Sequence, residues 1–169
     1  MNRNTLFLIL NLLIATTAPL FGQLREHPDK SLKGVKGVRV IVNYQAPVID
    51  SYGLTQKQLQ DAVELRLKVD NIKVLTDKEW KHESGKPYFY ITIEGTQVGS
   101  EKAPMFFYTI ATDLIQEVLL SRIPSFKTEG STWNQDYNLV LVKDELREVL
   151  LKIDEVAHDF AQSVHEANK

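Results

Sequence analysis

A long helical stripe near the C-terminus constrains the fold of this chain most strongly. Between residues 139 and 164, apolar residues recur every three or four positions, and no proline or glycine interrupts them. This spacing aligns them on one side of an α-helix, with charged residues such as Asp144 and Glu155 opposite. We therefore expect a closing helix that packs on a second layer through Leu139, Val142, Leu146, Val149, Leu150, Ile153, Ala157, Phe160 and Val164.

A second helix is predicted by its start. Gln58 follows Thr55 by three residues, which is a capping box, and Leu54 and Leu59 flank the cap as a hydrophobic staple. We expect this helix to run from Thr55 to about Val69, ended by Asp70-Asn71, with Leu59, Ala62, Val63 and Leu67 facing inward.

Alternation of apolar and polar residues, typical of strands with one buried face, recurs between these helices and before the first one. We expect strands over residues 38–43, 72–75, 88–94, 106–122 and 131–137. Residues 77–84 are polar and turn-rich, residues 95–104 are predicted to be a connection, and residues 123–130 are predicted to be a turn.

The element order is strand, helix, strands, helix. It predicts an α+β fold: a small, mostly antiparallel sheet with two helices packed on one face. We expect residues 34–169 to form a single domain, and the polar residues 23–33, which contain Pro28, to form a flexible arm before it.

Residues 1–22 have the three parts of a secretory signal peptide. Arg3 gives a short basic start, an apolar run extends from Leu6 to Leu20, and small residues precede a polar stretch. We expect cleavage after Gly22; the alternative is an uncleaved N-terminal anchor. The mature protein is then expected to be exported, periplasmic or secreted, without stable membrane insertion.

The composition narrows the functional classes. The chain contains no cysteine, which excludes thiol catalysis, thiolate metal sites and lipid attachment at the cleavage site. Its formal net charge of −2 gives no electrostatic argument for nucleic acid, so we expect no nucleic-acid partner.

Catalytic and metal motifs are not recognisable in the sequence. Asp154, His158 and His165 project from one side of the closing helix, but no further ligands follow at a metal-site spacing. Asp154 and His158 can instead form an ion pair. The chain has no nucleophile elbow and no glycine-rich phosphate loop. We therefore expect no enzyme, no cofactor and no metal.

Arg66 is a candidate anchor residue because it falls inside the apolar arc of the first helix. A guanidinium in such a place needs acceptors. It could hold an anionic ligand, it could form a structural ion pair with a carboxylate from the sheet or the closing helix, or its stem could snorkel to the edge.

Three aromatic residues indicate a possible interaction surface. If Phe89, Ile91 and Ile93 face the helices, then Tyr88 and Tyr90 face the other way, and Phe107 falls on the same side of its strand. With helices on one face only, these rings could form a recognition patch. Alternatively, a loop carrying Trp80 or Trp133 covers them.

Short motifs resemble those of a poorly characterised family of small exported bacterial proteins. They are Gly53-Leu54-Thr55 followed by Val63-Glu64-Leu65-Arg66-Leu67-Lys68, and downstream Gln116-Glu117-Val118, Arg122 and Thr132-Trp133. The chain is also similar to small α+β domains of envelope lipoproteins and translocation-assembly proteins, although it lacks their lipidated cysteine. The resemblance implies no activity.

The sequence thus favours an exported, non-enzymatic domain that binds a protein or envelope component through an exposed sheet face. The alternative is a small-molecule carrier in which Arg66 holds an anionic ligand.

Overall fold

The computed structural model describes residues 30–45, 54–100, 102–142, 145 and 147–169. The predicted signal peptide lies outside these residues. In chain order the elements are η1 (Lys30–Leu32), β1 (Gly37–Gln45), α3 (Gln56–Val69), β2 (Lys73–Val74), α4 (Asp77–Trp80), β3 (Tyr88–Ser100), β4 (Ala103–Leu120), β5 (Ile123–Val142) and α5 (Arg147–Ala167).

The strands form one mixed sheet in the order β2-β1-β3-β4-β5. The α+β class is as predicted, but the sheet is less antiparallel than expected. β1 pairs in parallel with both β2 and β3, whereas β4 is antiparallel to β3 and to β5. The reason is the crossover through α3, because a strand that follows a helical crossover returns in the same direction as the first strand.

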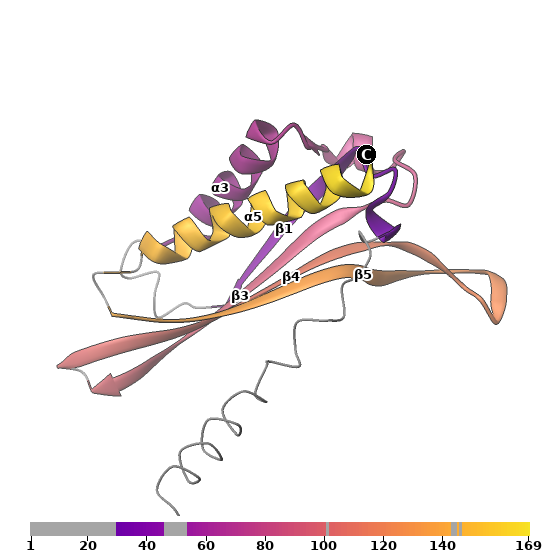
Figure 1. Cartoon of the computed structure of the whole chain (residues 1–169). Coiled ribbons are helices and arrows are strands. Elements are labelled where there is room, and N and C mark those ends of the chain that lie inside the picture. The colour runs from indigo at the N-terminus through magenta and orange to yellow at the C-terminus, as the bar shows by residue number, and fades with distance from the viewer. Residues whose placement is uncertain (1–29, 46–53, 101, 143–144, 146) are drawn as a thin grey trace, which may run out of the picture.

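α3 and α5 lie together on one side of the sheet (Figure 1). We call the opposite side the open face. Strand residues alternate between the two: Phe89, Ile91 and Ile93 are fully buried toward the helices, while Tyr88 and Tyr90 point to the open face and are half-buried. Among the described residues, no helix is long and apolar enough to cross a membrane.

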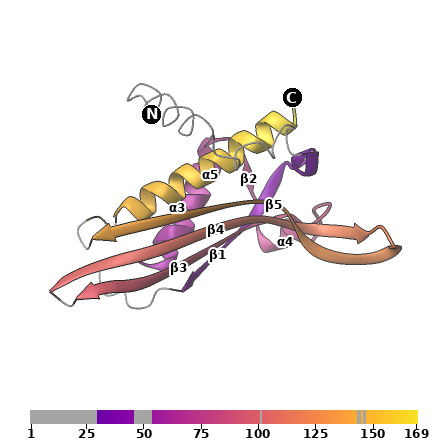
Figure 2. The same ribbon diagram turned by 60° about the horizontal axis from the view of Figure 1, so that its bottom comes forward.

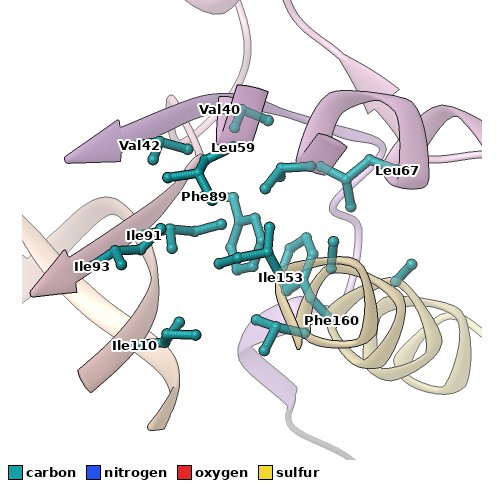
Figure 3. Close-up of a cluster of buried hydrophobic side chains, with 14 of the residues drawn as sticks. Val40, Val42, Leu59, Leu67, Phe89, Ile91, Ile93, Ile110, Ile153 and Phe160 are labelled. Atoms are coloured by element: carbon teal, nitrogen blue, oxygen red, sulfur yellow. The ribbon is translucent and has the colours of Figure 1, made fainter. Parts of the chain in front are cut away.

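The core is centred on a stack between β3 and α5. The rings of Phe89 and Phe160 are nearly parallel, with centroids 4.3 Å apart, and Trp133 packs edge-on against Phe160 at 5.2 Å. Aliphatic side chains from α3 and β1, among them Leu59 and Val40, surround the stack (Figure 3). This packing is what fixes α5 on the sheet.

Strands β3 and β5 are longer than predicted. Residues 95–104 were expected to connect two strands, but the β3–β4 ladder continues through them to the pair Ser100–Ala103. Residues 123–130, expected to be a turn, are the first part of β5. Both stretches belong to hairpins that project beyond the helices (Figures 1 and 2). Their larger apolar side chains, Val98, Ile123 and Phe126, are therefore exposed.

The closing helix starts later than its apolar stripe. Residues 139–142 belong to β5, where Leu139 pairs with Tyr108 and Leu141 with Phe106. The spacing of these residues also fits a helix. In the structure they form a strand instead, and pairing with β4 places the Leu141 side chain in the core. The described helix runs from Arg147 to Ala167, and Leu146 of the predicted stripe lies outside the described residues.

Two short elements were not predicted as structured. The expected arm ends earlier than residue 33, since η1 forms at Lys30–Leu32 and Leu32 is fully buried in the core. α4 lies in the predicted turn-rich stretch 77–84. A second capping box starts it, in which Thr76 and Glu79 bond reciprocally.

Candidate interaction surface

Exposed apolar side chains gather on the open face where β3, β4 and β5 run beyond α3. Two cross-strand rows are adjacent there: Val98–Met105–Val142 and Thr96–Phe107–Val140. Neighbouring strands are about 5 Å apart and these rows about 7 Å apart, so the side chains adjoin. We call the five apolar residues Val98, Met105, Phe107, Val140 and Val142 the apolar patch.

The exposure of the patch is unusual for large apolar side chains. Phe107 retains 38% of its accessible surface, Met105 41% and Val140 63%. The local sequence explains this, because residues 105–108 are four large apolar residues in a row, and a strand can turn only alternate ones to the core. Phe106 and Tyr108 take the buried positions, which leaves Met105 and Phe107 outside.

The three aromatic residues singled out from the sequence all lie on the open face, but not together. Tyr90 pairs across the ladder with Asp113, six residues along β4 from Phe107. At about 3.4 Å per residue this separates them by roughly 20 Å. Phe107 belongs to the apolar patch, whereas Tyr88 and Tyr90 lie at the start of β3, which we call the tyrosine end of that strand.

α4 partly covers the tyrosine end. The Trp80 ring meets Tyr88 edge-on with a centroid distance of 6.1 Å, and the Arg39 guanidinium lies 5.4 Å from the Trp80 ring centre. Tyr88 donates a hydrogen bond to Glu129 at 2.9 Å. Desolvation and this bond raise the pKa of Tyr88 to about 12. The cover expected from a Trp80 loop is therefore present at Tyr88, while Trp133 lies in the core.

The edge of β1 is closed by two side chains of α3. Gln60 accepts a hydrogen bond from the Val42 amide and donates one to the Val40 carbonyl, both at 3.1 Å. Gln56 donates to the Val42 carbonyl at 2.7 Å. β2 is only two residues long, so these amides continue its parallel ladder along β1. Single-sequence patterns gave no signal for this role of the glutamines.

Arg66 meets a carboxylate of the C-terminal helix. Its Nε lies 2.9 Å from Asp154 Oδ1 and its Nη2 lies 2.6 Å from Oδ2, a two-pronged pair. The hydrogen bond to Asp154 raises the pKa of Arg66 above its usual value. Asp70 lies on the other side of the guanidinium, with Oδ1 3.9 Å from Nη1. An anionic ligand at Arg66 would therefore have to displace Asp154.

The two histidines of α5 also face the end of α3. His158 Nδ1 lies 2.9 Å from Asp70 Oδ2, and His165 Nε2 lies 2.7 Å from the Asp70 carbonyl oxygen. Asp70, the C-cap of α3, thus links α3 to α5 through both its side chain and its backbone. Within the described ranges, no three histidine, aspartate or glutamate side chains are arranged to hold a metal ion.

Comparison with known proteins adds no family to this description. No protein-family model matches the chain. No curated protein matches it either.

Proposed function

We propose that this chain is a non-enzymatic binding domain that holds another protein or envelope component against the open face of its sheet, through the apolar patch. The proposal includes export, to the periplasm or outside the cell, after removal of residues 1–22. The observation that carries it is the adjacency of five exposed apolar side chains on three neighbouring strands.

The patch has the features of a recognition surface. Large contiguous apolar surfaces on soluble domains are uncommon and often functional. An aromatic ring and a methionine, two residue types enriched in protein interfaces, lie at its centre. The rows toward the middle of the sheet are polar, including Thr109, whose hydroxyl bonds Asn138 at 3.1 Å. An apolar centre with a polar border is the usual anatomy of an interface.

The carrier alternative depends on Arg66, which is the weaker candidate. Its guanidinium is already paired with Asp154 and lies close to Asp70. Binding an anion in place of Asp154 would break this ion pair between α3 and α5.

Site-specific photo-crosslinking tests the proposal. A benzophenone amino acid at Phe107 should cross-link to one defined partner in the cells that produce the protein. The matched control is the same probe at Leu65, which is 64% exposed on α3. Equal cross-linking from both positions, or none from Phe107, would reject the open face as the binding surface.

A further inference from the structure

We propose that the partner binds as an extended strand added to the outer edge of β5, along Asn134–Val142, and that it carries apolar side chains at one end and a basic side chain opposite Asp136. This inference rests on the proposed function and names the kind of partner. Strand addition supplies backbone hydrogen bonds for affinity, and the side chains supply specificity.

The two edges of the sheet are treated differently. On the β1 side, β2 and the side chains of Gln56 and Gln60 occupy the backbone groups of Val38 to Val42. On the other side, β5 is the last strand, and in the described part of the chain no strand pairs with its outer edge. Proteins normally cover or block such edges, because exposed strands pair with other chains. Among the described residues, such cover is present at the β1 edge and not along the β5 edge.

The part of β5 that follows its bulge is Asn134–Val142. A bulge interrupts the ladder where Leu114 pairs with Trp133 and Ile115 with Ser131, and η1 reaches this point through the Ser31 hydroxyl, which donates to the Thr132 carbonyl at 2.7 Å. Beyond it, the segment is braced by α5: the Tyr137 hydroxyl donates to Asp159 at 3.1 Å. This leaves a firmly held strand edge that ends beside the apolar patch.

The side chains of this segment specify the partner. On the open face they are Asn134, Asp136, Asn138, Val140 and Val142. The C-terminal end of β5 is therefore apolar, and Asp136 places a negative charge four residues before Val140. A strand laid beside it would place apolar side chains next to Val140 and Val142.

The charges of the open face favour a basic partner. Glu94, Asp113, Glu117, Glu129 and Asp136 lie on this face, against Arg39 and Lys127. Both cations are already paired, Arg39 with Asp77 and Lys127 with Glu117. None of the described lysines or arginines forms an ion pair with Asp136. A lysine or arginine from the partner would supply that charge.

A second copy of this chain fits the edge less well. A two-fold antiparallel pairing centred on Asn138 sets Asp136 opposite Val140, and one centred on Leu139 sets Asp136 opposite Val142. Both registers set the Asp136 carboxylate beside an apolar side chain and supply no cation to pair with it. The structure therefore favours a different chain as the added strand.

Peptide binding tests the inference directly. The probe is a labelled synthetic peptide of about nine residues, the length of an ordinary strand, in which valine alternates with threonine and two lysines occupy one end. The matched peptide carries glutamates in place of the lysines. With the full mature chain, fluorescence anisotropy should show binding of the lysine peptide and at least about tenfold weaker binding of the glutamate peptide, a difference of about 1.4 kcal/mol.

Protein variants and amide exchange locate the site. Val140→Lys should weaken binding about tenfold, while Leu151→Lys, at an exposed apolar position on α5, should leave it unchanged. Bound peptide should slow hydrogen exchange at alternate amides of residues 134–142, because only outward-facing amides gain a partner.

Three outcomes would overturn the inference. Equal binding of the two peptides would remove the charge requirement, and dimers of the free chain disrupted by Val140→Lys would make a second copy the occupant. Peptide contacts at Phe107 without slowed exchange in β5 would place the partner on the face and not on the edge. That last result would leave the proposed function intact, whereas loss of Phe107 cross-linking in cells would remove the proposed function itself.

Discussion

Gln60 pairs with the backbone of Val42 as a neighbouring strand would. Its side-chain oxygen accepts from the Val42 amide, and its nitrogen donates to the Val40 carbonyl two residues earlier. In a parallel ladder, one residue bonds these same two groups on the facing strand. The side-chain amide of Gln60 on α3 thus takes the place of a backbone amide that a longer β2 would supply.

Gln60→Ala should lower the free energy of unfolding by about 1–2 kcal/mol, because two part-buried backbone groups lose their partners. Chemical denaturation measures this, with Lys57→Ala, an exposed position on the same helix, as the control. The variant should also aggregate faster, since the β1 edge becomes available. Equal midpoints and equal aggregation in the two variants would show that the edge is protected in another way.

Arg66→Leu should destabilise the fold by about 1–2 kcal/mol by leaving Asp154 without its partner. The pair is only partly buried, with side-chain exposures of 28% and 42%, so water softens the loss. A double-mutant cycle with Asp154→Asn should give a coupling of about 1 kcal/mol. Arg66→Lys should recover only part of the stability, because lysine loses the two-pronged geometry. Additive effects of the two substitutions would mean that the pair contributes nothing.

Thr55→Ala should cost about 1 kcal/mol, because the Thr55 side chain accepts from the Gln58 amide at the start of α3. Thr55→Ser keeps that acceptor and should be nearly neutral. Urea midpoints of the three proteins decide it. A midpoint for Thr55→Ala that matches wild type would show that the cap does not limit the stability of α3.

Glu79 should titrate far below an ordinary glutamate. The hydrogen bond from Lys73, together with those from the Thr76 amide and hydroxyl, lowers the pKa of Glu79 to about 2. A lowered acid pKa means that the stabilising contribution is complete above the unfolded pKa of about 4.3 and is lost as pH falls toward 2. Carbon NMR of the Glu79 carboxyl measures the midpoint. Lys73→Met should raise it, and a wild-type midpoint near 4.3 would mean that these contacts do not persist in solution.

The mature protein should begin at Gln23. Mass spectrometry of the exported form measures this, and an Arg3→Glu variant, which removes the basic start, should export less efficiently. Detection of intact Met1 in the exported protein would show that the leader is retained as an anchor.

Local signals in the sequence predicted local structure well. The capping box at Thr55 is confirmed, and Leu59, Val63 and Leu67 are buried as expected from their helical spacing. Strand alternation likewise predicted which side of β3 faces the helices. In these elements, the residues that determine the local conformation lie within a few positions of one another in the sequence.

Long-range pairing could not be read from the sequence. Residues 139–142 satisfy a helical stripe and a strand equally well, and only their ladder with β4 decides between them. The apolar patch was found in part, through Phe107 on β4. Met105 lies on the same strand, but Val98 comes from β3, and Val140 and Val142 come from β5. The partner of Arg66 was expected to be a carboxylate, yet its identity depends on how α3 crosses α5, 88 residues away.

The stack of Phe89 on Phe160 also determines when the hydrophobic core can close during synthesis. The central strand β3 is synthesised well before α5, because β4 and β5 lie between them in the sequence. Until α5 emerges, α3 is the helix available to cover this side of the sheet, and the contacts between Phe89 and Phe160 cannot form. Core contacts of large sequence separation therefore form late. For a chain exported as we propose, α5 leaves the cytoplasm after the strands that it covers, so translocation can begin before the core is able to close.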